Sequence, residues 1–147
     1  MLGLYKEMEY WVLPSVLLVA PWPAMPKCIL IVDDNLPIRK SIRRFLESET
    51  DFEVCGEAVD GLDAIEKARE LNPDLIILDL SMPRMDGLRA SRVLRPMLPH
   101  APIILFTMHR DAISDAEAGK AGVSAVVSKI GELAELGEQI HRLLEPV

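Results

Sequence analysis

Five polar residues come directly after four apolar runs of this 147-residue chain. They are Asp33, Asp34, Asp79, Thr107 and Lys129. The runs are short and rich in Ile, Leu and Val, which is typical of buried parallel strands. Because the carboxyl ends of parallel strands meet at the same edge of a sheet, where open α/β proteins place their sites, we expect these five side chains to lie close together.

Carboxylates brought together in this way repel one another. Two unit charges about 4 Å apart cost roughly 1 kcal/mol in water and roughly 4 kcal/mol at an effective dielectric constant of 20. Mg²⁺ would relieve the repulsion, because it prefers the oxygen ligands that Asp33, Asp34 and Asp79 provide. A carboxylate nucleophile, a divalent metal, the Lys129 ammonium and the Thr107 hydroxyl together suit phosphoryl transfer to the carboxylate. The alternative is an ion-pair network of Lys129 and the acids that has no chemical role.

The segments that would position these residues alternate between two kinds. The apolar runs predict strands at 27–32, 52–58, 75–78, 103–106 and 123–128. Helices are predicted after Asn35, at about 62–71, at about 87–95 before Pro96, at about 111–120, and from Leu133 to near Glu145. Short crossovers between five strands and five helices predict an α/β fold, with a parallel sheet covered on both faces.

Two of these segments differ from the rest in composition. The strand at 52–58 is less apolar than the others, so we expect it at an edge of the sheet. The helix at 111–120 is built mainly from small residues and can bury little apolar surface. We therefore expect this helix to be weakly held and mobile.

Two groups of basic residues are interpreted as solvated helix faces. The first group lies on the first helix and consists of Arg39, Lys40, Arg43 and Arg44, with docking to an acidic partner as the alternative. The second group lies in and near the third helix and consists of Arg84, Arg89, Arg92 and Arg95.

Composition narrows the class of protein. The net charge of −7 and an aromatic content of 5% argue against nucleic acid or an anionic membrane as the main partner. Two cysteines and three histidines offer no zinc-binding spacing, and the cysteines are interpreted as small apolar residues of a reducing cytosol, with a disulfide or redox pair as the alternative. The length predicts one domain, at 26–147, after an N-terminal extension at 1–25.

The extension is the part of the chain that is hardest to interpret. Its apolar stretch at 11–20 is interrupted by Pro14 and is too short to span a bilayer as a helix, which needs roughly 20 residues. We expect it to be poorly ordered, the alternatives being a segment that binds a partner or touches a membrane, and a signal peptide. A translation start at Met25 is a further hypothesis, which N-terminal sequencing of the native protein tests.

The polar residues at the strand ends, together with Pro83 and Gly87 after Asp79, resemble the receiver domain of two-component response regulators, in particular stand-alone regulators of the chemotaxis type. The resemblance runs from about Lys27 to the C-terminus. It implies a flavodoxin-like doubly wound (βα)5 fold with strand order 2-1-3-4-5, a cytoplasmic protein, and a phosphoacceptor that is not a turnover enzyme. The implied phosphoacceptor is Asp79, with Mg²⁺ held by Asp33, Asp34, Asp79 and the backbone carbonyl of Ser81, and with the phosphoryl group contacted by Thr107 and Lys129.

The resemblance also implies a switch, in which phosphorylation shifts the face formed by the fourth helix, fifth strand and fifth helix. Three positions depart from the family pattern. Val126 stands where the family commonly has a switching Tyr or Phe, Ile130 where it commonly has Pro, and Met108 where a small residue is usual, so that access to the phosphoacceptor could be narrowed. Ser81 and His109 occupy positions that tune the lifetime of the phosphoryl group in the family.

Several functions fit these residues. The first is a receiver that takes a phosphoryl group from a sensor histidine kinase or phosphotransfer protein and signals to an unidentified output protein, with phosphorylation-dependent homodimerisation as one route. The second is a phosphate sink or relay intermediate, and the third is the receiver fragment of a transcription regulator. A Mg²⁺-dependent phosphohydrolase is disfavoured, because Ser81 stands where a second acid would be needed and no insertion offers a cap.

Overall fold

The structure, a computed structural model, describes residues 25–145. The predicted N-terminal extension therefore lies outside the described residues, except for Met25. No helix within the described range has the length and apolar character needed to cross a membrane.

Five parallel strands form one sheet in the order β2-β1-β3-β4-β5. Their bounds are β1 (Cys28–Val32), β2 (Glu53–Ala58), β3 (Leu75–Leu78), β4 (Ile103–Thr107) and β5 (Ala125–Ser128). This order confirms the flavodoxin-like fold, and β2 lies at an edge of the sheet as its weaker apolar character predicts. Both cysteines lie in the strands β1 and β2 and are free thiols.

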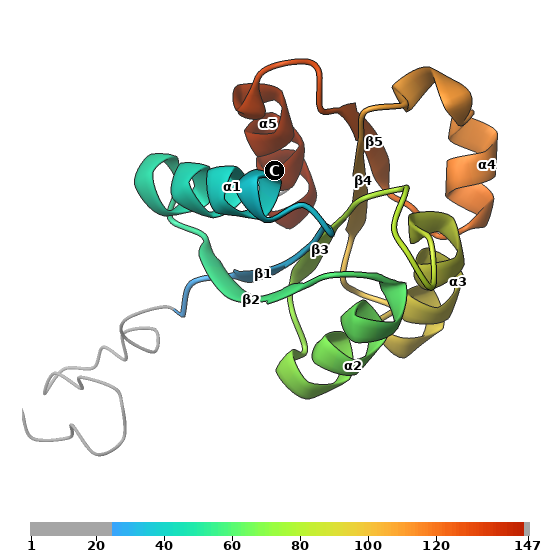
Figure 1. Cartoon of the computed structure of the whole chain (residues 1–147). Coiled ribbons are helices and arrows are strands. Elements are labelled where there is room, and N and C mark those ends of the chain that lie inside the picture. Colours follow the sequence, from blue (N-terminus) through green and yellow to red (C-terminus); the bar gives the residue numbers. More distant parts are fainter. Residues whose placement is uncertain (1–24, 146–147) are drawn as a thin grey trace, which may run out of the picture.

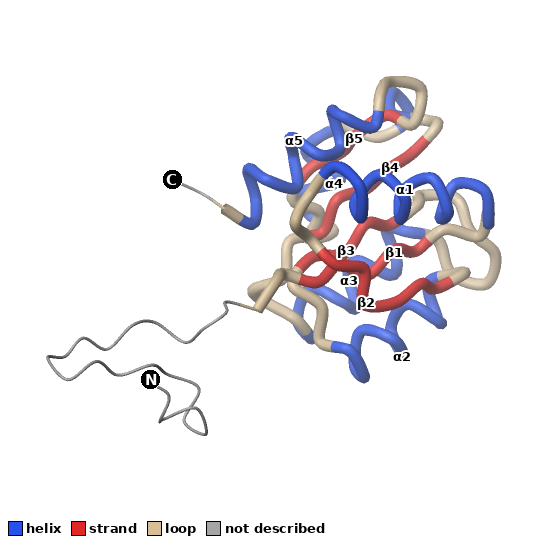
Figure 2. The backbone as a smooth tube through the Cα atoms, turned by 90° about the vertical axis from the view of Figure 1, so that its left-hand side faces the viewer, coloured by secondary structure: helices blue, strands red, loops and turns tan. Residues whose placement is uncertain are grey.

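Five helices cover the sheet on both faces (Figures 1 and 2). Their bounds are α1 (Leu36–Glu49), α2 (Gly61–Leu71), α3 (Gly87–Met97), α4 (Asp115–Lys120) and α5 (Leu133–Leu144), with a short 3₁₀ turn η2 (Arg110–Ala112) before α4. Side chains of α1 and α5 pack on one face, and those of α2, α3 and α4 pack on the other. The result is a three-layer α/β/α sandwich.

The central strand β3 divides its four residues between the two cores. Leu75 and Ile77 face α1 and α5, whereas Ile76 and Leu78 face α2 and α3, because successive side chains of a strand point to opposite faces. All four are at most 1% exposed. Burial of each such side chain contributes about 1.5–3 kcal/mol, so the strand that precedes Asp79 is firmly fixed.

Side-chain caps set the start of four helices. In each case the cap oxygen accepts a hydrogen bond from the backbone N–H three residues later, which typically contributes about 1 kcal/mol. The cap residues are Asn35 for α1, Asp60 for α2, Asp86 for α3 and Ser114 for α4. All four are of the residue types that are preferred at the start of a helix.

The third helix does not end before Pro96, as predicted, but continues to Met97. Pro96 lies in the last turn, where its missing N–H removes one hydrogen bond of the helix. The turn closes beyond it, because the Leu98 N–H donates to the Leu94 carbonyl at 2.9 Å. The Arg95 guanidinium also donates to the carbonyls of Leu98 and Ala101, which supports the chain after the helix.

The fourth helix is shorter than the predicted 111–120 and begins at Asp115. Ser114 and Glu117 form a reciprocal capping box, in which each side chain accepts a hydrogen bond from the backbone N–H of the other residue. This box fixes the start of α4 and leaves residues 110–112 as a separate 3₁₀ turn. The last strand is also shorter than predicted, since pairing with β4 begins at Ala125 instead of Val123.

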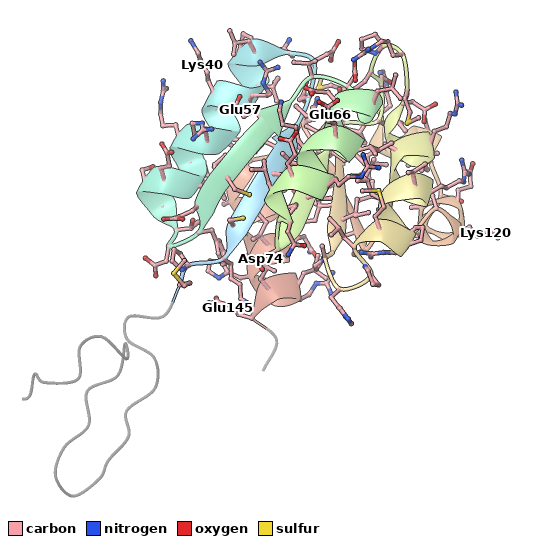
Figure 3. The ribbon with its side chains drawn as sticks, turned by 90° about the horizontal axis from the view of Figure 1, so that it is seen from below. Lys40, Glu57, Glu66, Asp74, Lys120 and Glu145 are labelled. Carbon is pink, nitrogen blue, oxygen red and sulfur yellow. The ribbon has the colours of Figure 1, made fainter. Side chains whose placement is uncertain are left out.

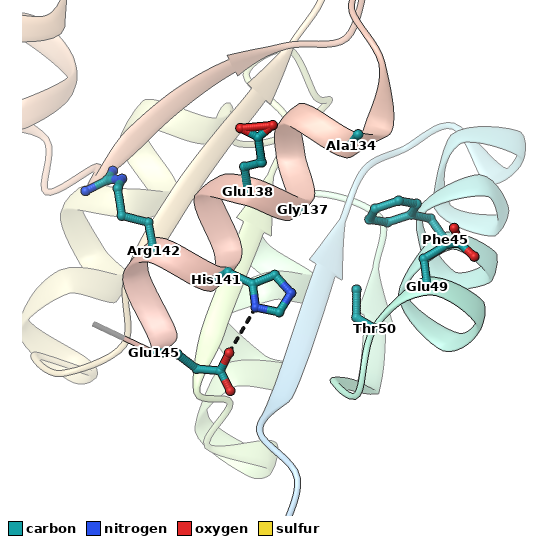
Figure 4. A pocket seen from close by; sticks show the side chains of 9 residues that line it. All are labelled: Phe45, Glu49, Thr50, Ala134, Gly137, Glu138, His141, Arg142 and Glu145. Atoms are coloured by element: carbon teal, nitrogen blue, oxygen red, sulfur yellow. Dashed lines mark hydrogen bonds and ion pairs between the residues drawn. The ribbon is translucent and has the colours of Figure 1, made fainter. Parts of the chain in front are cut away.

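The helices α1 and α5 lie close together on their shared face of the sheet (Figure 4). A side chain at Gly137 would come within 2.9 Å of the Phe45 ring, so the glycine permits this approach. Between the two helices is an open groove of about 580 Å³, lined among others by Phe45, His141 and Glu145. The His141 Nδ1 lies 2.9 Å from a carboxylate oxygen of Glu145. None of the groove's lining residues belongs to the five polar residues at the strand ends.

Gly87 is the position where an added methyl group should be most costly. Its Cβ would overlap the carbonyl oxygen of Asp79 and lie 3.0 Å from the Leu80 Cα, so backbone atoms would have to move. We expect Gly87→Ala to lower the free energy of unfolding by about 3 kcal/mol. Urea unfolding followed by circular dichroism measures this change.

Gly119 in α4 is the matched control for this substitution. A Cβ at this position meets nothing within 4 Å. Gly119→Ala should therefore keep or raise the stability, by up to about 1 kcal/mol, because alanine favours a helix more than glycine does. A Gly87→Ala variant as stable as the wild type would contradict the steric argument.

Candidate functional site

Three carboxylates converge at the carboxyl edge of the sheet. Asp33 and Asp34 follow β1, and Asp79 follows the neighbouring strand β3. Each contributes an oxygen to a set whose members all lie within 4.8 Å of one another. Asp33 is 2% and Asp79 7% exposed, whereas Asp34 is exposed to solvent. The structure thus brings together the three acids that the sequence places at strand ends.

Lys129, which follows the edge strand β5, reaches into this cluster. Its Nζ lies 2.6 Å from Asp33 Oδ2 and 3.1 Å from Asp79 Oδ1, and its side chain is 7% exposed. The backbone N–H of Lys129 donates to the Thr107 carbonyl at 2.8 Å, which extends the pairing of β4 and β5 by one residue. One ammonium faces three carboxylates, so the described side chains leave an excess of negative charge.

Burial raises the pKa of the Asp79 carboxyl above its usual range, and the negative charge of Asp33 raises it further. Lys129 acts in the opposite direction without cancelling these effects. The site therefore holds an ionised Asp79 at a cost in free energy. Carboxylate oxygens that need a further cation are the donor set that suits Mg²⁺, so the residues present fit this metal.

Thr107 lies at the end of β4 and is 1% exposed. Its Oγ1 accepts a hydrogen bond from the His109 N–H at 2.9 Å. Because the oxygen serves as an acceptor here, the hydroxyl hydrogen stays available to donate elsewhere.

The other residues singled out in the sequence lie around the cluster. Ser81 and His109 are exposed. Met108 and Ile130 are 53% and 74% exposed, on the loops after β4 and β5. Val126 is half-buried on β5, opposite Leu105 of β4.

One residue next to the site was misinterpreted from the sequence. Arg39 is not part of a solvated face, since its side chain is 12% exposed. Its guanidinium donates to the Asp33 carbonyl at 2.6 Å, and its Nε lies 2.8 Å from Glu57 of β2. Arg43 also pairs with Glu57, at 2.7 Å. Figure 3 places Glu57 on the edge strand beside α1, where these arginines reach it.

Glu57 is the anchor for both arginines. Burial alone would raise the pKa of its carboxyl, but the hydrogen bonds from Arg43 and Arg39 lower the pKa below its usual value. An ionised Glu57 therefore fixes Arg39, and Arg39 fixes the backbone that carries Asp33. Arg39 lies six residues after Asp33, in the first turn of α1, and this spacing was the signal in the sequence that could have indicated its contact with the Asp33 backbone.

Comparison with known proteins finds a family model that matches most of the chain. The family model of the response regulator receiver domain matches residues 29–141. The chain is 36% identical over 119 residues to a protein-glutamate methylesterase/protein-glutamine glutaminase from Nocardioides sp., a match that covers 80% of this chain and 32% of that protein. It is 36% identical over 118 residues to the response regulator protein VraR of Staphylococcus saprophyticus, covering 80% and 56% respectively. The chain thus spans between a third and about half the length of these relatives.

Solved structures resemble the chain over most of its length. A two-component response regulator of the LuxR family from Aurantimonas sp. superimposes with a TM-score of 0.76 at 34% identity, covering 82% of this chain and 86% of that one. The response regulator domain of Thermotoga maritima CheB gives a TM-score of 0.74 at 28% identity, covering 84% and 99%.

The raised pKa of Asp79 predicts how the metal-free protein responds to pH. The pKa of Asp79 is higher in the folded protein than in the unfolded chain, where it is near 3.9. The contribution of Asp79 to the free energy of unfolding is therefore fully present below the unfolded pKa, and it is lost as the pH rises through the folded pKa. At pH 7, with a chelator present, Asp79→Asn should therefore unfold at a higher urea concentration than the wild type. Its free energy of unfolding should be larger by on the order of 1 kcal/mol. The difference should shrink as the pH falls toward the unfolded pKa.

Asp34→Asn is the matched control, because Asp34 is exposed and its charge is better solvated. It should change the free energy of unfolding less than Asp79→Asn does. An Asp79→Asn variant that is less stable than the wild type at every pH would contradict the assignment of repulsion and burial at Asp79.

Proposed function

Because the chain belongs to the response regulator receiver family, we propose that Asp79 accepts a phosphoryl group from a phosphohistidine of a histidine kinase or phosphotransfer protein. The observation that carries this proposal is the position of Asp79. Its carboxylate lies at the end of the central buried strand, 3.1 Å from the Lys129 ammonium and beside Asp33 and Asp34. A nucleophilic oxygen, a fixed positive charge and a potential metal site thus occupy one edge of the sheet.

In the transfer, an oxygen of Asp79 forms a bond to phosphorus while the phosphorus–nitrogen bond of the donor breaks. The imidazole leaves with the electron pair of that bond and takes up a proton. Lys129 can also pair with a phosphoryl oxygen, because its ammonium has three N–H groups and contacts two carboxylates, those of Asp33 and Asp79. The Thr107 hydroxyl hydrogen can be donated to another phosphoryl oxygen, since its oxygen is engaged as an acceptor from His109.

Asp33, Asp34 and Asp79, with the backbone carbonyl of Ser81, would hold Mg²⁺. When bound, this ion neutralises charge that develops on the transferred phosphoryl group. Two contacts position Asp33 for this role. Lys129 contacts the Asp33 carboxylate, and Arg39 donates to the Asp33 backbone carbonyl. Ser81 and His109 lie on the exposed side of the site, where they could tune the lifetime of the phosphoryl group.

The phosphoryl group would act on an output partner through the face of α4, β5 and α5. It adds roughly −1.5 to −2 charge, which draws Thr107 and Lys129 toward it. The relatives carry the matching region within longer proteins, so the partner is either another protein or a linked output domain. A cytoplasmic location follows from the histidine kinase as donor.

Phosphoryl uptake tests the proposal directly. The protein is incubated with Mg²⁺ and acetyl phosphate, and its intact mass is measured. We expect a phosphate-sized gain in the wild type that is absent without Mg²⁺ and absent in Asp79→Asn. Asp111→Asn, which changes an exposed aspartate after β4, is the matched control and should still gain the phosphate.

A phosphate gain that persists in Asp79→Asn would reject Asp79 as the acceptor. Absence of a gain in the wild type, with acetyl phosphate and with phosphorylated histidine kinases alike, would reject phosphoryl transfer altogether.

Hydrogen exchange tests the output face. With Mg²⁺ and beryllofluoride as a phosphoryl mimic, we expect the amide exchange rates of α4 to change, because α4 buries only Ala118 among its six residues. The amides of α2, which α3 separates from α4, should exchange at the same rate with and without the mimic and serve as an internal reference. Bound mimic with unchanged exchange in α4 would favour a phosphate sink over a signalling receiver.

A further inference from the structure

The loop at 80–86, between β3 and α3, connects the proposed phosphoacceptor to the rest of the fold. It follows Asp79 and contains Ser81, whose carbonyl is a proposed metal ligand. Two backbone bonds fix its ends: the Asp79 N–H donates to the Val32 carbonyl at 2.9 Å, and the Gly87 N–H donates to the Leu80 carbonyl at 2.8 Å. The middle of the loop needs support from elsewhere.

Arg84, in the middle of this loop, has an unfavourable backbone conformation. Its φ is 63°, in the left-handed region that a residue with a Cβ rarely adopts unless its surroundings hold it there. Its Nε lies 2.6 Å from Asp60 Oδ2. The next residue, Met85, accepts a hydrogen bond from the Gly61 N–H at 3.1 Å. The loop is therefore docked on the start of α2 by a side-chain contact and a backbone contact.

Asp60 is suited to fix this loop. It is 3% exposed, and both of its carboxylate oxygens are used: Oδ1 caps α2 by accepting from the Asp63 N–H at 2.9 Å, and Oδ2 faces Arg84. The hydrogen bond from Arg84 lowers the pKa of the Asp60 carboxyl, so it stays ionised at neutral pH. The neighbouring Gly61 lets the loop approach, because a Cβ there would come within 2.7 Å of the Met85 side chain.

We propose that Arg84 and Asp60 form a positioning pair that keeps the loop at 80–86 in its metal-binding conformation. The inference rests on the proposed function, since it concerns the Mg²⁺ that Asp33, Asp34, Asp79 and the Ser81 carbonyl would hold. Without the pair, the loop would have to be ordered when the metal binds. The loss should therefore appear as weaker Mg²⁺ binding, because residues that orient ligands contribute strongly to metal affinity.

Calorimetric titration with MgCl₂, at constant ionic strength, measures this effect without any phosphodonor. We expect Arg84→Ala to raise the Kd for Mg²⁺ by about tenfold. Asp60→Asn should raise it similarly, because asparagine keeps an acceptor for the α2 cap but turns an uncharged group toward Arg84. The double variant should be no weaker than either single one, since both remove the same contact.

Two further substitutions at position 84 separate the ion pair from the backbone strain. Arg84→Gly removes the guanidinium but adopts a positive φ without cost, so we expect Mg²⁺ binding to stay weak. Arg84→Lys retains a positive charge near Asp60 and should restore part of the affinity. Hydrogen exchange of the amides at 80–87 should be faster in Arg84→Ala than in the wild type.

Arg142→Ala is the matched control, because Arg142 bonds to Gln139 on α5, away from this loop. It should leave the Kd for Mg²⁺ and the exchange of the loop unchanged. A wild type that binds Mg²⁺, with Arg84→Ala and Arg84→Gly binding it equally well, would overturn the positioning role alone. A wild type that binds no Mg²⁺ would overturn the positioning role together with the proposed metal site.

Discussion

The contact of Lys129 with Asp33 and Asp79 is the interaction on which the site depends. It joins the chain after β5 to the chain after β1 and β3, across the middle of the sheet, at 2.6 and 3.1 Å. Breaking a buried pair of this kind leaves a charge without a partner, which costs far more than the pair itself contributes. One ammonium does not balance three carboxylates, so the site carries an excess of negative charge. A bound metal ion would reduce this excess, and a phosphoryl group that binds together with the metal would alter it again. The chemistry of the site follows from this imbalance.

The rest of the fold supplies the rigidity that such a site requires. The four residues of β3 are at most 1% exposed, so the strand that delivers Asp79 has no freedom to relax away from its neighbours. The edge strand β2 has a different role, because it supplies none of the candidate ligands. Glu57, within β2, anchors Arg39 and through it the Asp33 backbone, while Asp60, just after β2, anchors Arg84. The carboxylates near this edge thus support both loops that carry the acidic cluster.

The sequence was sufficient for the strand ends and insufficient for these supporting contacts. Apolar runs that stop at Asp33 or Asp79 identify buried parallel strands, and topology then brings their ends together. The prediction that α3 ends before Pro96 was wrong because it considered only the local effect of proline on a helix. The last turn of α3 is closed by the Leu98 N–H, and the chain after it is supported by Arg95. The pairs Arg39–Glu57 and Arg84–Asp60 join residues 18 and 24 positions apart, and nothing local indicates which carboxylate each arginine will meet.

The anchoring of α4 indicates how a change at the site would reach the surface. Its C-terminal end is tied to α3, because the buried Ser91 hydroxyl donates to the Ala121 carbonyl at 2.8 Å. Its N-terminal end depends on an exposed capping box and on the loop that leaves β4 at Thr107. A shift of Thr107 would therefore act first on the N-terminal end of α4, with the other end as pivot.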